Sequence, residues 1–210
     1  MTHTTTTAAV TGAGPGHRAA LAPDAAAVGL RVVAAAAWPE SAADRVPAPI
    51  AGFVVSSFSP LAAEVVRRCL GRRPAPRADA PPAVTAVVLV SPLGDLAGAV
   101  HVAETVDGRG RLGPLLFFQA VPNAVAGHVA ALWRLTGPVV CVADTGAGLA
   151  VAALLLADRD ADEALLIRVD QAPGAGVGDR AAAVLLRAHP EDAHPEDAVP
   201  EDADTEGEQP

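Results

Sequence analysis

The apolar positions of the chain fall into short continuous runs, which segments rich in proline, glycine or charged residues separate. These runs do not alternate with polar residues, as a strand with one solvated face would, so they predict strands that are buried on both faces. The predicted strands are Leu30–Ala37, Val84–Val90, Val139–Ala143 and Glu163–Val169. Such strands need helices on both sides of their sheet, and the segments between them supply the candidates.

Alanine-rich stretches with helix signals lie between the predicted strands. Ser59 followed by Pro60 has the pattern of a helix start. We expect this helix to run to Cys69–Leu70, where Gly71 stops it. Further helices are predicted over Asp95–Thr105, Pro122–Leu135 and Leu149–Ala157. Strands interleaved with helices predict an α/β domain with helices on the faces of its sheet.

The two ends of the chain differ from this middle part. Residues 1–28 are rich in Thr, Ala, Gly and Pro and lack periodicity, so we expect a flexible N-terminal segment. Residues 173–210 are expected to form a Gly-rich linker, a short helix over Asp179–Ala188 and a disordered acidic tail with HPEDA repeats. The domain itself is therefore placed at residues 29–172.

Charge is concentrated in the expected tail. The net charge is −9 at pH 7, and the nine carboxylates after His189 account for all of it. Because the other acidic residues are balanced by fifteen Arg and no basic block occurs, nucleic-acid binding is disfavoured. No secretory signal and no uninterrupted apolar run of ~18 residues is present, so we expect a cytoplasmic protein without a membrane span.

Neither a metal nor a cofactor is expected. His189 and His194 stand among carboxylates in a weak metal-binding pattern, which a solvated tail explains better. The glycines of Gly12–Gly16 could suggest a phosphate-binding loop. No clear strand precedes them, and Pro15 removes a backbone donor, so a flexible loop is favoured.

The candidate chemistry lies where a predicted strand gives way to an apolar helix. The segment Asp144–Gly148 breaks the strand sharply, and this layout presents Thr145 at the positive N-terminal end of the helix. As a nucleophile Thr145 would need an explicit base, and neighbouring Asp144 would repel a developing alkoxide. We therefore favour a turn or cap residue over a covalent nucleophile. Thr145, Gly146 and Gly148 remain the candidate substrate-binding residues.

Two other side chains of reactive type have plainer explanations. Cys141 lies in the predicted strand four residues before Thr145, where its side chain should point into the sheet packing. Like Cys69, it is expected to be a small apolar filler. His128 lies in an apolar helix, so we expect a hydrogen-bonded core histidine rather than a catalytic one.

The segment PLLFFQAVPNAVAGHVAALWRLTGPVVCVADTGAGLAVA resembles the N-terminal half of β-ketoacyl synthases of the thiolase-like superfamily. In that family FxxxVPNAxAGHxA precedes GPxxxV and an elbow that carries the acylated Cys. Alignment on Gly148-Leu149 puts Thr145 at the position of that Cys. The resemblance extends roughly over Leu30–Gln171. It implies a single thiolase-like half with a mixed, mostly parallel sheet.

The resemblance also implies a function. The catalytic histidines of the family belong to its C-terminal half, which we expect this chain to lack. We therefore expect a ketosynthase-like accessory or partner subunit of a polyketide or fatty-acid-type pathway, without its own condensing activity. The helix Leu149–Ala157 has no polar face, so a ketosynthase-type subunit or a second copy of the chain should cover it.

The partners and the function class leave alternatives open. An acyl carrier protein is a further partner that the resemblance implies. One alternative is an active β-ketoacyl synthase or acyltransferase whose partner supplies the missing residues. The other is an interaction protein that acts through its acidic tail.

Overall fold

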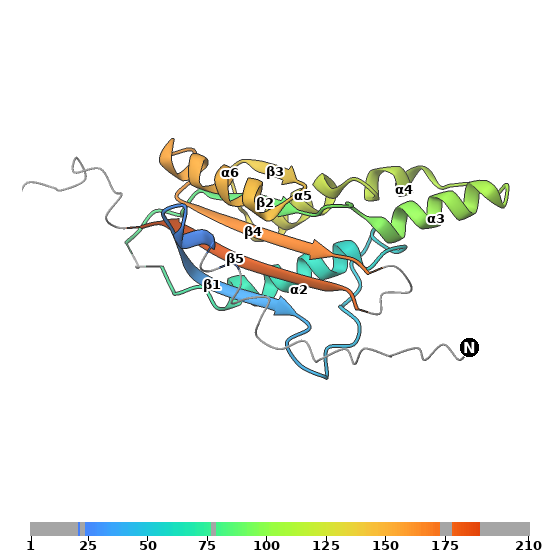
Figure 1. The fold of residues 1–210 in the computed structure, drawn as a ribbon, viewed down its shortest axis with the longest axis horizontal. Coiled ribbons are helices and arrows are strands. Elements are labelled where there is room, and N and C mark those ends of the chain that lie inside the picture. Colours follow the sequence, from blue (N-terminus) through green and yellow to red (C-terminus); the bar gives the residue numbers. More distant parts are fainter. Residues whose placement is uncertain (1–20, 22–23, 77–78, 173–177, 190–210) are drawn as a thin grey trace, which may run out of the picture.

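The computed structural model describes residues 21, 24–76, 79–172 and 178–189, so the Gly12–Gly16 loop, most of the N-terminal segment and the acidic tail lie outside the described residues. Five strands form one sheet, and helices lie against both of its faces (Figure 1). The strands are β1 (Leu30–Trp38), β2 (Thr85–Val90), β3 (Val139–Val142), β4 (Glu163–Asp170) and β5 (Arg180–Ala188). The helices are α2 (Phe58–Gly71), α3 (Leu96–Asp107), α4 (Pro114–Gln119), α5 (Pro122–Trp133) and α6 (Thr145–Ala157). Among the described residues, no helix has the length and apolar character needed to cross a membrane.

The sheet has the strand order β1-β5-β4-β2-β3. β2 pairs in parallel with β3 and with β4, whereas β5 runs antiparallel to both β4 and β1. Leu89 of β2 thus lies between Cys141 of β3 and Ile167 of β4. The expected α/β fold with a mixed sheet is confirmed. The sheet was expected to be mostly parallel. Because β5 is antiparallel to both of its neighbours, parallel and antiparallel strand pairs are instead equal in number.

Each face of the sheet has its own hydrophobic core. On one face, Leu61 of α2 and Val125 of α5 pack with Leu165 of β4. On the other face, Leu149 of α6 packs with Val88 of β2. Burying one such side chain contributes roughly 1.5–3 kcal/mol. Because β2 and β4 are covered on both sides, almost every one of their residues is buried, which explains their continuous apolar sequences.

The helix expected over Asp179–Ala188 is wrong, because this segment forms β5 in the interior of the sheet. Ala and Leu favour helices in isolation, and a run that is buried on both faces has no period that separates helix from strand. Pairing with β1 on one side and β4 on the other overrides the local preference. The domain was expected to end at residue 172. This boundary is wrong, because the segment 178–189 contains β5 and belongs to the domain.

The strand expected to be buried at Val139–Ala143 is an edge strand. β3 ends at Val142, and its residues are exposed or half-buried, with Val139 40% exposed. Within the described residues, β2 is its single neighbour, so one side of the β3 backbone is unpaired. A continuous apolar run therefore corresponds to a buried strand in β2 and β4, whereas in β3 it corresponds to a partly exposed strand at the edge of the sheet.

The helices α3 and α4 extend beyond the carboxyl ends of β2 and β4 (Figure 1). α3 agrees with the helix expected from Asp95, whereas α4 was not expected, although its first residue is a proline, as in many helices. Of the six residues of α4, Leu116 alone is buried. Leu115, Phe117 and Phe118 are 70%, 61% and 69% exposed. This arm, defined as Leu96–Gln119, therefore offers apolar side chains to solvent.

The start of α2 differs from the expected one by two residues. The helix begins at Phe58 rather than Pro60. The Ser56 hydroxyl accepts a hydrogen bond from the backbone N–H of Phe58 at 3.1 Å. A serine therefore does satisfy a free N–H at this end, but it is not Ser59, which is buried in the first turn.

Candidate functional site

The start of α6 lies at the carboxyl end of the parallel strands. The backbone turns from an extended conformation at Asp144 (φ −133°, ψ 159°) directly into the helix at Thr145. The Asp144 carboxylate accepts a hydrogen bond from the N–H of Ala147 at 2.8 Å. This cap sets a carboxylate at the positive end of the helix dipole. The helix terminus that could attract a substrate anion is therefore already occupied by an anion of the chain itself.

The Thr145 hydroxyl is tied to the neighbouring strand. It accepts a hydrogen bond from Nη1 of Arg168, at the end of β4, at 2.9 Å. Arg168 in turn pairs through Nε with Asp170 at 2.7 Å. In the described part of the chain, no imidazole, thiol or carboxylate is hydrogen-bonded to this hydroxyl. A guanidinium only donates, so it cannot take the proton that a nucleophilic threonine must lose.

The two candidate glycines of this turn have different surroundings. Gly148 is buried, and an added Cβ would lie 2.8 Å from Cγ2 of Val90 and 3.2 Å from Cδ1 of Leu166. Its lack of a side chain therefore allows α6 to lie close on β2 and β4. Gly146 is exposed, and a Cβ there would meet only an oxygen of Asp144, at 3.2 Å. Of the two, Gly146 alone could face a ligand.

His128 is not the core histidine that was expected. It is half-buried on α5, and its ring packs edge-on against Phe53, with centroids 5.6 Å apart. It lies between two apolar hollows of about 530 and 560 Å³. Phe118 and Val121 line the first, and Leu132 lines the second. His128 is thus part of a shallow apolar surface, on the face of the sheet opposite α6.

Both cysteines are packing residues, as expected. Cys69 is fully buried, and this burial raises the pKa of its thiol to about 12. Cys141 is half-buried and packs on the side of the sheet covered by α2 and α5, away from α6. Burial raises the pKa of the Cys141 thiol as well. Both thiols therefore stay protonated near neutral pH, and only a thiolate would be a strong nucleophile.

A polar cluster near the same end of the sheet was missed in the sequence. The side-chain amide of Gln171 donates to the hydroxyls of Ser56 and Ser57 at 3.1 and 3.0 Å. These hydroxyls donate to Asp95 and Asp179 respectively. The cluster joins the ends of four elements, α2, α3, β4 and β5. The hydrogen bond between Ser57 and Asp179 joins residues 122 positions apart, so no local sequence signal could have revealed the cluster.

Comparison with known proteins identifies the fold. No family model and no curated protein sequence matches the chain. Among solved structures, it is similar to the complex of the ketosynthase ApeO with its chain length factor ApeC from Xenorhabdus doucetiae. That match has a TM-score of 0.58 at 18% identity, over 76% of this chain and 79% of that chain.

Two further structures are similar at the same low level of identity. The ishigamide ketosynthase/chain length factor matches with a TM-score of 0.53 and 20% identity, over 66% of this chain and 45% of its own. A β-ketoacyl synthase from Burkholderia phymatum STM815 matches with a TM-score of 0.51 and 15% identity, over 81% and 54%. The chain thus spans about half the length of these two proteins. Its fold is similar to that of a half of a ketosynthase, as the sequence resemblance implied.

Proposed function

We propose that this chain is a partner subunit of a ketosynthase and does not itself catalyse condensation. The observation that carries the proposal is the chemistry at the start of α6. The residues Asp144–Gly148 contain no cysteine. The Thr145 hydroxyl accepts from Arg168, and the carboxylate of Asp144 caps the helix. A ketosynthase-like half without an activated nucleophile is better suited to assembly than to acyl transfer.

The surface around β3 supports a partner. Among the described strands, β3 has one unpaired backbone edge, and the flanking helices α5 and α6 leave Leu132 and Leu154 63% and 59% exposed. Monomeric proteins usually cover or charge such edges and keep apolar patches small. A second protein that adds to this edge would bury both the free backbone groups and the apolar side chains.

The composition of two of the similar structures supports a particular kind of partner. One is a ketosynthase in complex with its chain length factor, and another, AntDE:AntF, is a type II polyketide synthase acyl-carrier protein in complex with its ketosynthase. We therefore take a ketosynthase-type subunit as the partner and a polyketide or fatty-acid-type pathway as the setting. Self-association through the same surface is the competing assembly.

The proposal is tested by intact-mass spectrometry after incubation with acyl-coenzyme A and acyl-carrier-protein thioesters. We expect no acyl adduct on the purified chain. Thr145→Cys is the informative comparison, because the N-terminus of a helix lowers the pKa of a thiol and favours the reactive thiolate. An adduct on the variant alone would show that the turn geometry is competent and only the nucleophile is missing. A stable acyl increment mapped to Thr145 of the parent chain would contradict the proposal.

One observation favours the alternative of an active enzyme. Arg168 places a positive charge 2.9 Å from the Thr145 oxygen, and such a charge would stabilise an alkoxide or a tetrahedral oxyanion. The missing element is a base, which a partner subunit would have to supply. Incubation of the chain with a ketosynthase-type subunit before the mass measurement tests this alternative in the same experiment.

A further inference from the structure

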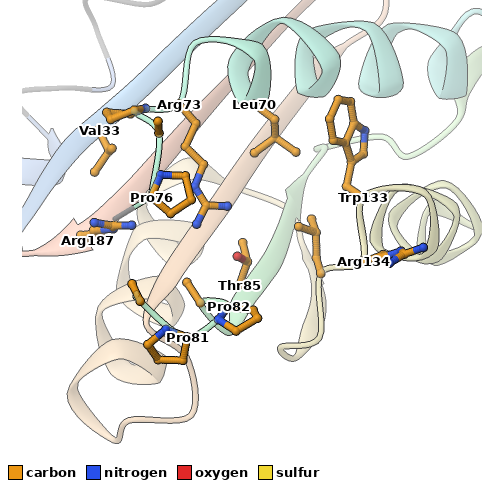
Figure 2. A pocket seen from close by; sticks show the side chains of 15 residues that line it. Val33, Leu70, Arg73, Pro76, Pro81, Pro82, Thr85, Trp133, Arg134 and Arg187 are labelled. Carbon is orange, nitrogen blue, oxygen red and sulfur yellow. The ribbon is translucent and has the colours of Figure 1, made fainter. Parts of the chain in front are cut away.

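A cavity of about 700 Å³ opens at the amino ends of β2 and β4, opposite to the end that carries Thr145. Figure 2 shows Arg73 reaching from the end of α2 into the middle of this cavity. Arg187 of β5 lies on one side of it, and Trp133 and Arg134 lie on the other. None of these residues takes part in the site at the start of α6.

A buried carboxylate underlies the cavity. Glu163, the first residue of β4, has no exposed surface. Its oxygens accept hydrogen bonds from Thr85 at 2.8 Å and from Nη2 of Arg187 at 2.9 Å. Nη2 of Arg73 lies 3.0 Å from the same carboxylate. A buried carboxylate needs one cation to be neutralised, and Glu163 has two.

The cavity therefore carries an excess of positive charge. Among the described residues, its lining includes the guanidinium groups of Arg73, Arg134 and Arg187 and no carboxylate. Arg73 uses only Nη2 on Glu163, and Arg187 uses Nε and Nη2. Within the described residues, the other N–H groups of these two side chains have no hydrogen-bond partner. They form two fixed donor groups that can hold an oxyanion.

The walls of the cavity are apolar. Leu70 and Leu135 line it, and Pro76, Pro81 and Trp133 add flat apolar surfaces around the arginines. A strongly hydrated inorganic anion would make no favourable contact with these walls. A ligand that has an apolar ring or chain next to its charged group would contact both the arginines and the apolar walls, and the volume suits a molecule of small-ligand size.

We propose that this cavity binds a small organic anion, in which a carboxylate or a phosphate monoester is carried on a flat apolar body. The anionic group binds Arg73 and Arg187, and the apolar body lies against Trp133 and the prolines. The site is distinct from the start of α6, and it does not depend on whether the chain is a ketosynthase partner.

Three probes of the same shape test this proposal on the full chain: 2-naphthoate, 2-naphthyl phosphate and neutral 2-naphthamide. Binding is followed through the indole N–H signal of Trp133 in ¹H–¹⁵N spectra, with Trp38, which lies outside the cavity, as an internal reference. We expect a saturable shift of Trp133 with at least one anion, and at least about tenfold weaker binding of the amide. Binding of both anions supports a general oxyanion site, and binding of one assigns its head group. Equal binding of the amide, or no shift at millimolar concentrations of any probe, would overturn the proposal.

Variants identify the groups that hold the anion. Arg73→Gln should weaken binding of the anions about tenfold, while Glu163 keeps Arg187 and Thr85 as partners. Arg72→Gln is the matched control, because this adjacent arginine pairs with Glu40 outside the cavity. Equal affinity of parent and Arg73→Gln, or an equal loss in both variants, would contradict the assignment.

A second pair of variants covers the case in which Arg73→Gln does not fold. Arg134 and Arg109 both have left-handed backbone angles (φ 54° and 56°), which Asn tolerates. Of Arg134 and Arg109, only Arg134 lines the cavity. Arg134→Asn should weaken the binding of the anions about threefold, as expected for a charge at the rim, and Arg109→Asn should not change it. Unchanged binding in Arg134→Asn or an equal loss in Arg109→Asn would count against the site.

Discussion

The helices on the two faces of the sheet, α2 and α6, are built for different surroundings. α2 buries Leu61, Val65 and other apolar residues and carries charged residues on its outer side. α6 has no charged residue from Thr145 to Ala157, and yet it buries only Gly148, Leu149 and Ala152. A helix that is apolar all round normally lies inside a protein. The outer side of α2 is thus covered by its own ion pairs, whereas α6 leaves apolar side chains such as Leu154 exposed among the described residues.

The charges of α2 form a continuous network over its core. Arg68 pairs with Asp44 and Glu64, each at 2.7 Å, and its guanidinium lies 4.8 Å from the ring centroid of Trp38. Arg72 pairs with Glu40 at 2.6 Å. These groups satisfy one another and shield the edge of the core beside α2 from water.

The largest effect should come from charging α6. Ala153 packs at the border of the α6 core, so Ala153→Asp would place an unpaired carboxylate there and lower the free energy of unfolding by roughly 2–4 kcal/mol. Leu154 is 59% exposed, and Leu154→Asp should leave stability nearly unchanged while it disrupts association. Thermal melts and light scattering of both variants separate the two effects.

A surface change outside this face serves as the control for both variants. Arg109→Asp, in the exposed loop after α3, should alter neither stability nor association. Two results would contradict the idea that a second protein covers α6. One is a parent chain that is monomeric at micromolar concentration and does not associate with a ketosynthase-type subunit. The other is a Leu154→Asp variant that assembles like the parent.

A smaller effect is expected on the α2 side. Arg68→Met keeps the apolar stem but removes the ion pairs and the contact with Trp38, and it should lower the free energy of unfolding by about 1–2 kcal/mol. Arg67 is 62% exposed, and among the described residues its ion-pair partner is Glu64 alone. Arg67→Met should therefore change the free energy of unfolding by no more than ~0.5 kcal/mol. Urea denaturation at constant ionic strength measures both. Equal effects would mean that the network acts only as solvated surface charge.

The smallest effect concerns acid. The hydrogen bond from Arg72 lowers the pKa of Glu40 from 4.5 to about 2. Between these pH values the unfolded chain takes up a proton that the folded chain does not, so stability should be complete above about pH 4.5 and should fall as the pH approaches 2. Arg72→Gln should reduce this dependence. Urea denaturation of parent and variant at pH 5 and pH 3 measures the free energy of unfolding at each pH. An identical change between the two pH values in both proteins would contradict the role of Arg72.

The sequence was a good guide where one element sufficed to determine its own structure. The runs that became β2 and β4 were correctly predicted, because strands buried on both faces are apolar throughout. The same reasoning failed for β5, whose Ala- and Leu-rich sequence is equally compatible with a helix until its two neighbours are known. Burial of β3 was also predicted wrongly, because this apolar strand lies at the edge of the sheet formed by the described strands.

In the candidate site, too, features that depend on one local segment could be predicted, and contacts between distant segments could not. The turn at Asp144 and the helix behind it were visible in the sequence, as was the absence of a cysteine. The contact of Thr145 with Arg168 was not visible, because it joins residues 23 positions apart on different elements. The pairing of Glu163 with Arg73 and Arg187 could not be predicted for the same reason, since three separate elements bring these charges together.

The position of β5 also has a consequence in time. Of the described strands it comes last in the chain, but it lies between β1 and β4, and β1 has no other neighbour among them. During synthesis the chain emerges from its N-terminus, so β1 and β4 must both wait with unpaired edges until residues 180–188 have left the ribosome. The nascent domain thus exposes two strand edges that favour aggregation until its final strand closes the gap.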